Sequence, residues 1–65
     1  MQGRRPHRLS RRELADALWV LEARRQTLLW ELEGVPSDNR RLWIELELLR
    51  IDFWQDYCRL ALAAT

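Results

Sequence analysis

Two long stretches free of glycine and proline, separated by one short break, limit this chain to two long helices. The stretches cover residues 7–33 and 37–65, with Gly34 and Pro36 between them. Gly34 can take the left-handed conformation that ends a helix, and Pro36 has no amide hydrogen with which to continue one. Helices of about 25 residues each span about 36 Å, so they can pack side by side along their whole length. The sequence therefore predicts an all-α, antiparallel two-helix hairpin.

Local signals place the helix ends. Ser10 and Glu13 have the spacing of a capping box, in which each side chain accepts a hydrogen bond from the backbone of the other residue. Ser37 or Asp38 can cap the second helix. The predicted segments are a flexible arginine-rich arm at 1–9 and a hairpin at 10–65, with helices at about 10–33 and 39–63 and a turn at 34–38.

Apolar residues recur every three or four positions in both predicted helices, which is the pattern of a helix–helix seam. In the first helix they are Leu14, Leu18, Leu21, Leu28, Leu32 and Val35. As the facing stripe of the second helix we assign Leu42, Leu46, Leu49, Phe53, Tyr57 and Leu60. One antiparallel register aligns Leu28 with Leu46 and Leu21 with Phe53.

The second helix carries more apolar surface than one neighbouring helix can cover. A further stripe, interrupted by Gln55, lies opposite the assigned seam. Exposed apolar surface of this size is typical of protein interfaces, and tryptophan is a frequent interface anchor. We predict a homodimeric four-helix bundle or docking to a protein partner. The predicted interface residues are Trp19, Trp30, Trp43, Ile44, Leu48, Ile51, Trp54, Cys58 and Leu62.

Two alternatives stay open for individual residues. Some tryptophan rings can instead lie along the surface under arginine stems such as those of Arg40 or Arg50. Arg25 and Asp56 interrupt apolar positions, and each can either reach the edge of its helix or pair with a neighbouring chain. Pairing with a neighbouring chain would determine which partner binds and in which register the helices pack.

Catalytic, metal and cofactor sites are not expected. His7 is the only histidine and Cys58 the only cysteine, so neither a zinc site nor an intrachain disulfide can form within one chain. Neighbouring acids such as Glu31 and Glu33 point to different sides of a helix. We expect a non-enzymatic protein. The single cysteine and the absence of a long apolar run favour a cytoplasmic location without membrane contact.

Charge is concentrated at the N-terminus, and this feature supports an alternative function. Residues 1–12 hold five arginines and no acid, whereas residues 13–65 hold six arginines and all 10 acids. A basic arm of this kind can contact phosphates. The candidate nucleic-acid contacts, which would equally suit an acidic protein partner, are Arg4, Arg5, Arg8, Arg11 and Arg12.

In length and topology the predicted hairpin resembles the plasmid-encoded repressor of primer. Local similarity is confined to Thr-Leu-Leu at 27–29 and Tyr-Cys-Arg-Leu at 57–60. That family recognises paired RNA loops with polar and basic residues on its first helices, where this chain carries Trp19 and Trp30. The resemblance implies a dimeric bundle and, as an expectation, RNA binding.

The leading functional hypothesis is an assembly or adaptor protein that acts through its Trp- and Leu-rich helix faces. The alternative is a small dimeric nucleic-acid-binding regulator that uses the arginine arm. The residues leave open whether the partner is a second copy or a different protein.

Overall fold

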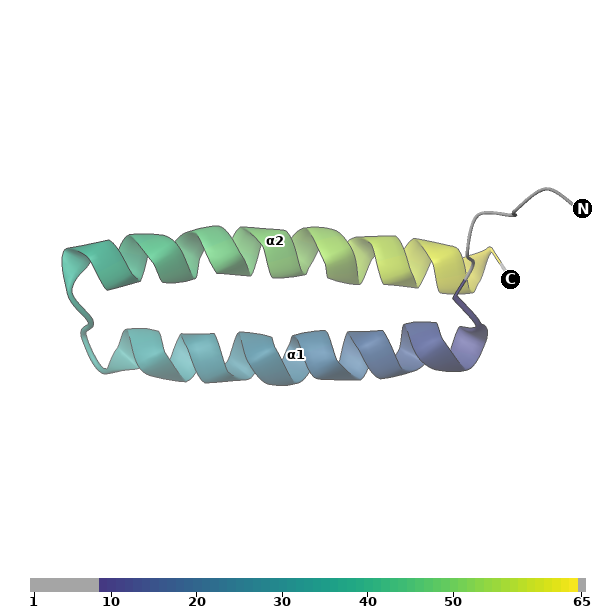
Figure 1. The fold of residues 1–65 in the computed structure, drawn as a ribbon, viewed down its shortest axis with the longest axis horizontal. Coiled ribbons are helices and arrows are strands. Elements are labelled where there is room, and N and C mark those ends of the chain that lie inside the picture. The colour runs from purple at the N-terminus through teal and green to yellow at the C-terminus, as the bar shows by residue number, and fades with distance from the viewer. Residues whose placement is uncertain (1–8, 65) are drawn as a thin grey trace, which may run out of the picture.

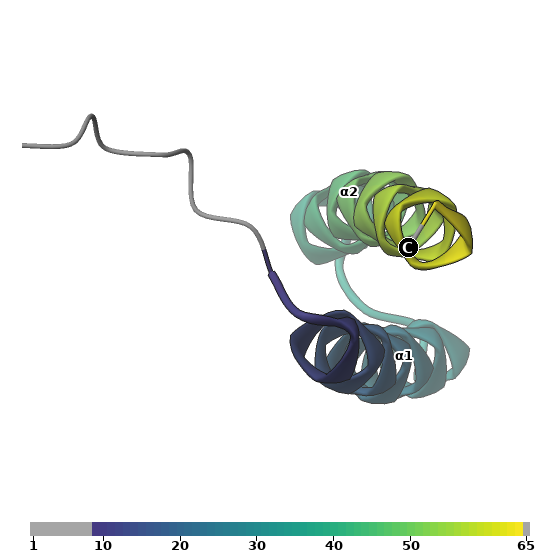
Figure 2. The same cartoon turned by 90° about the vertical axis from the view of Figure 1, so that its right-hand side faces the viewer.

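The computed structural model describes residues 9–64, and within them the chain forms two helices packed against each other. Helix α1 spans Arg11–Glu33 and helix α2 spans Asp38–Ala63. They run antiparallel and lie side by side, joined by a short turn (Figures 1 and 2). The predicted all-helical hairpin is thus confirmed for the described residues. Neither of its helices is long and apolar enough to cross a membrane.

The helix starts follow from their capping residues. The amide of Glu13 donates to Ser10 Oγ at 3.1 Å, and the Ser10 amide donates to Glu13 Oε1 at 2.7 Å. The predicted capping box is therefore confirmed. At the start of α2, Ser37 is the cap, because its Oγ accepts the Arg40 amide at 3.3 Å. Asp38 is instead the first residue of the helix.

The turn differs from prediction. Gly34 has φ −81°, so the expectation of a left-handed glycine is wrong, and Val35 takes the left-handed conformation with φ 55°. Amide hydrogen bonds from Gly34 to the Glu31 carbonyl and from Val35 to the Leu32 carbonyl, both 3.1 Å long, extend the last helical turn. The chain then reverses at Val35, because the residue before a proline is disfavoured in the helical region.

The core lies between the helices and is small. Leu28 and Ile44 are fully buried and Ile51 is 5% exposed, with Leu21, Leu32 and Leu48 packed around them. Nearer the chain ends, Leu14 and Cys58 are also buried. On α2 these residues belong to one heptad-spaced row, which we call the inner stripe: Ile44, Leu48, Ile51, Gln55, Cys58 and Leu62.

The predicted seam of α2 is therefore wrong. The residues that we assigned to it point away from α1, and each is more than half exposed. We call this row the outer stripe: Leu42, Leu46, Leu49, Phe53, Tyr57 and Leu60. The sequence correctly indicated two apolar faces, but α1 covers the opposite one.

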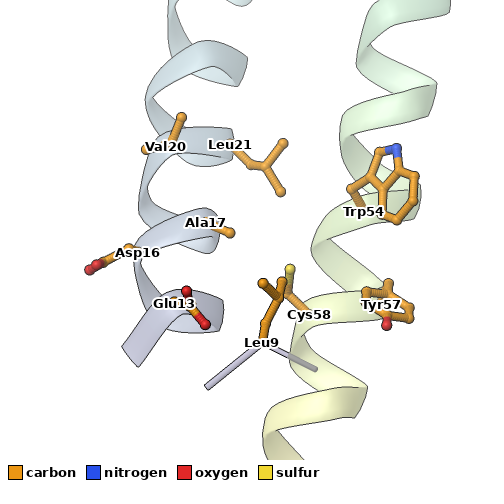
Figure 3. Close-up of a pocket in the computed structure, with 9 residues that line it drawn as sticks. All are labelled: Leu9, Glu13, Asp16, Ala17, Val20, Leu21, Trp54, Tyr57 and Cys58. Carbon is orange, nitrogen blue, oxygen red and sulfur yellow. The ribbon is translucent and has the colours of Figure 1, made fainter. Parts of the chain in front are cut away.

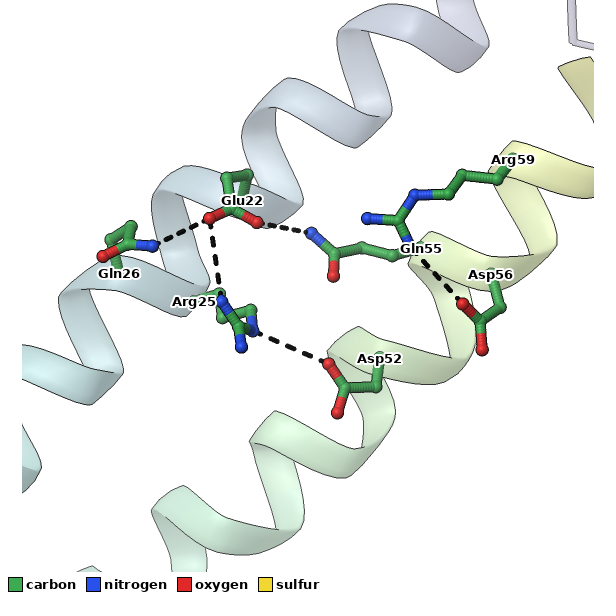
Figure 4. Close-up of polar contacts among 7 residues, drawn as sticks. All are labelled: Glu22, Arg25, Gln26, Asp52, Gln55, Asp56 and Arg59. Atoms are coloured by element: carbon green, nitrogen blue, oxygen red, sulfur yellow. Dashed lines mark hydrogen bonds and ion pairs between the residues drawn. The ribbon is translucent and has the colours of Figure 1, made fainter.

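Polar pairs along the edges of the hairpin explain this choice. Gln55, in the middle of the inner stripe, is only 4% exposed, and its amide nitrogen donates to Glu22 Oε1 at 3.0 Å (Figure 4). On the same edge, Arg25 lies 3.7 Å from Asp52. With α1 packed on the inner stripe, both of these α1 groups have partners on α2. The pairing of Arg25 with Asp52 occurs within one chain and needs no neighbour.

Candidate interaction surface

The outer stripe is a continuous row of exposed apolar side chains along α2. Its side chains are exposed by 52% (Tyr57) to 72% (Leu60). At about 100° per residue, the stripe is centred about 180° from the inner stripe, on the side of α2 that α1 leaves open. At about 200 Å² for a fully exposed large apolar side chain, these six residues expose roughly 700 Å² per chain. Such an area approaches the roughly 800 Å² that each partner contributes to a standard interface.

Aromatic rings extend this surface around one edge of α2. Trp54 packs edge-to-face against Phe53 and Tyr57, with ring centroids 5.2 and 5.7 Å apart. Such contacts hold the rings in fixed orientations before any partner arrives. Trp43 is different, because the Arg40 guanidinium lies 4.5 Å from its ring centroid. Trp43 thus contacts an arginine of its own helix and stays 42% exposed.

A groove opens between the helices on the edge opposite the polar pairs (Figure 3). It has a volume of about 540 Å³ and is almost entirely apolar. Its lining residues are Leu9, Glu13, Asp16, Ala17, Val20, Leu21, Trp54, Tyr57 and Cys58. In Figure 3, Trp54 and Tyr57 line the α2 side, and the Asp16 carboxylate points away from the groove. The groove makes the apolar surface of α2 continuous with the first half of α1.

Val20 was missed by the sequence analysis as part of this surface. It is 60% exposed and lies at the groove. Its spacing from Ala17 places both on one side of α1, and that signal was present in the sequence. The sequence-based assignment of α1 used its leucines, Val35 and two tryptophans and left Val20 out.

Ion pairs and hydrogen bonds tie α1 to α2 and shift the affected pKa values. Arg40 forms a bidentate pair with Glu31, including an Nη2–Oε1 hydrogen bond of 2.8 Å. This hydrogen bond lowers the pKa of Glu31 and raises that of Arg40. Hydrogen bonds from Gln26 and Gln55 lower the pKa of Glu22. Both carboxylates thus hold their charge at neutral pH while they bridge to neighbouring side chains.

The predicted interface residues separate into three groups. Trp19 and Trp30 are 75% and 78% exposed on α1, and Trp43 and Trp54 are exposed on α2. The remaining five belong to the inner stripe, and their assignment to an outward interface is corrected, because α1 covers them. They are Ile44, Leu48, Ile51, Cys58 and Leu62.

The predicted arginine contacts are only partly within the described residues. Arg4, Arg5 and Arg8 lie outside them. Arg11 donates from Nη1 to the Leu62 carbonyl at 3.1 Å, so its side chain reaches the end of α2. Arg12 is exposed at the start of α1. The structure therefore does not bring these arginines together as one described site.

Asp56, the other interrupting polar residue, lies on the exposed side of α2. Its carboxylate is 3.3 Å from Arg59 of the same helix (Figure 4). Among residues 9–64, no three side chains of the metal-binding types form a cluster that could hold an ion.

Comparison of the chain with family models, with curated proteins and with solved structures gives no match. The surface described above is therefore the basis for a functional interpretation.

Proposed function

We propose that this chain is a small, non-enzymatic assembly protein of the cytoplasm that self-associates through the outer stripe of α2. The observation that carries the proposal is a second apolar row on α2, with residues three or four positions apart, opposite the one that α1 covers. An apolar face of this length in water favours association, because its burial removes a large area from solvent. A second hairpin on this face would produce a four-helix assembly in which the two copies of α2 pack against each other and each α1 lies on the outside.

The small core supports the proposal. Only five apolar residues are buried in the described hairpin: Leu14, Leu28, Ile44, Ile51 and Cys58. Chains of this size usually need a disulfide, a metal or oligomerisation to supplement such a core. Cys58 is a free, buried thiol, so an intrachain disulfide does not serve this purpose. Association with another chain is a further route, and we propose a second copy as that chain.

Light scattering and sedimentation across a range of protein concentrations test the proposal. We expect a discrete dimer. Leu49→Gln, a polar change in the middle of the outer stripe, should lower the average mass in solution because it weakens the dimer. The matched control is Trp30→Gln, which removes an equally exposed apolar side chain from α1. A wild-type chain that stays monomeric at all concentrations would contradict the proposal, as would loss of the dimer in the Trp30 variant alone.

Nucleic-acid binding through the arginine arm stays a prediction. The arm is basic, and Arg12 adds an exposed charge where α1 begins. Deletion of residues 2–8 should abolish most affinity for RNA or DNA oligonucleotides without changing the mass of the assembly. Each lost phosphate contact on duplex DNA would flatten the slope of log affinity against log salt by about 0.9. No binding by the full chain at low salt would exclude this function.

A further inference from the structure

The spacing of the outward positions of α2 is the same in both directions along the helix. Five residues of the outer stripe, Leu42, Leu46, Leu49, Phe53 and Leu60, form this row together with Asp56, which precedes Tyr57, and the steps are four, three, four, three and four residues. A two-fold interface brings one surface patch against itself. When two helices meet antiparallel, the order of one row is reversed. A row with symmetric spacing can therefore match itself at every position.

From this symmetry we infer that α2 pairs antiparallel with α2 of a second copy, about a two-fold axis level with Ile51. This register places Leu42 against the partner's Leu60 and Leu49 against the partner's Phe53. The inference rests on the proposed function and specifies its partner and geometry. A shift by one heptad in either direction would leave Leu42 or Leu60 uncovered, so this register buries the most apolar surface.

Asp56 distinguishes antiparallel from parallel pairing. In a parallel pair, Asp56 would lie against its own copy, and two like charges would meet within an apolar seam. In the antiparallel pair, each Asp56 lies beside the partner's Leu46 instead. Its carboxylate keeps its contact with Arg59 at 3.3 Å, at the edge of the helix. The charge is compensated by Arg59 within its own helix in either orientation, but only the parallel pair would add the like charge of the partner's Asp56.

Residues that flank the outward row agree with the same register. Antiparallel alignment brings the exposed Glu45 beside the partner's Arg59, and the two-fold axis repeats this pair. It also brings Trp43 beside the partner's Tyr57. Two like-charge approaches occur at the axis, where Asp52 and Arg50 each meet their own copy. Each has an opposite charge within its chain: Arg25 lies 3.7 Å from Asp52, and Glu47 lies 3.5 Å from Arg50.

Disulfide trapping tests the register directly. In a Cys58→Ala background, the Leu49→Cys and Phe53→Cys chains are mixed at equal amounts in a glutathione redox buffer, with one chain carrying a tag to distinguish masses. We expect the ratio of the mixed disulfide to either homodisulfide to be at least about fivefold higher than random pairing would give. Excess Leu49→Cys homodisulfide would indicate parallel pairing and overturn the inference. The Cys58→Ala chain alone must keep the wild-type mass.

A Trp30→Cys chain in the same background is the matched control. Trp30 lies on the outside of α1, 78% exposed and far from the inferred axis, so this chain should not cross-link. Cross-linking through position 30 would overturn the inferred geometry while leaving self-association intact. A monomeric mass of the wild-type chain would instead overturn both the inference and the proposed function.

Charge reversal at the flanking pair gives a second readout that needs no cysteine. Glu45→Arg and Arg59→Glu should each weaken dimerisation about three- to tenfold, because each change places like charges together at both ends of the dimer. The double variant Glu45→Arg/Arg59→Glu should recover part of the affinity lost in the two single variants, because the new glutamate at position 59 would face the new arginine at position 45 of the partner while it also lies beside Asp56 of its own helix. Additive losses in the double variant would show that these residues do not face each other, and would overturn the register.

Discussion

The two apolar faces of α2 both have residues three or four positions apart, but they have different neighbours. The inner stripe contains the β-branched Ile44 and Ile51 and the small Cys58, all at most 5% exposed. The outer stripe contains leucines and aromatic rings, all more than half exposed. The inner stripe also has a polar position, Gln55, that is buried and bonded to Glu22 on α1. The face that packs against α1 of the same chain thus has the smaller side chains and a polar residue whose hydrogen bond is made.

The comparison shows that apolar periodicity alone does not select which face is covered within the chain. Hydrophobic burial is non-directional and favours both faces of α2. Hydrogen bonds and ion pairs have directional requirements, and those of α1 are met beside the inner stripe. The larger apolar residues remain on the outer stripe, where a separate chain can cover them.

The largest expected difference between the faces concerns a buried charge. Ile44→Asp should remove cooperative unfolding, because a carboxylate at a fully buried position costs at least about 3 kcal/mol. Leu46→Asp, whose parent side chain is 53% exposed, should retain a cooperative melt by circular dichroism. Its midpoint should no longer rise with protein concentration. Equal damage by both changes would contradict the distinction between the two faces.

Replacing one polar residue on each face, Gln55 on the inner side and Asp56 on the outer side, with leucine should sharpen the comparison. Gln55→Leu is expected to raise the free energy of unfolding of the hairpin by about 1 kcal/mol, because a buried polar group is replaced by an apolar one of similar size. Glu22 keeps its hydrogen bond from Gln26 at 2.8 Å. Asp56→Leu, next to the outer stripe, should instead tighten association. Urea titration measures the first effect and sedimentation the second. If Gln55→Leu changed association and Asp56→Leu changed the stability of the hairpin, the assignment of the two faces would be wrong.

The turn should affect stability without favouring either face of α2. Left-handed backbone costs a residue such as Val35 about 1–2 kcal/mol, and asparagine tolerates it better. Val35→Asn should therefore add about 0.5–1 kcal/mol in urea unfolding. Gly34→Ala should add about 0.4–1 kcal/mol, because φ −81° suits alanine and the new Cβ would lie 3.4 Å from the Glu31 carbonyl oxygen. A loss of stability in Gly34→Ala would place the left-handed residue at Gly34 instead.

The smallest expected effect is the pH dependence of the polar pairs. Folding lowers the pKa of Glu22 and Glu31 below the ordinary value of 4.5. Their stabilising contribution is therefore complete above that value and is lost as the pH falls through the lowered values in the folded chain. The thermal midpoint should decline below about pH 4.5. Glu31→Gln should reduce this decline. If the thermal midpoint of this variant depended on pH as in the wild-type chain, the decline would be due to other carboxylates.

Much of the architecture could be predicted from the sequence. Ser10 with Glu13 predicted the start of α1, and the break at Gly34 and Pro36 predicted a two-helix hairpin. These features depend on interactions between residues a few positions apart, such as caps and turns, and local sequence specifies them. The presence of two apolar faces on α2 could also be recognised from spacing alone.

Tertiary structure decided which of those faces α1 covers, where the left-handed residue lies and which residues form the groove. Gln55 appeared in the sequence as an interruption, yet in the fold it is a buried, bonded part of the core. That outcome depends on Glu22, 33 positions away in the chain. Apolar periodicity is a property of one helix, whereas the matching of hydrogen-bonding groups belongs to a pair of helices, so only the packed structure reveals it.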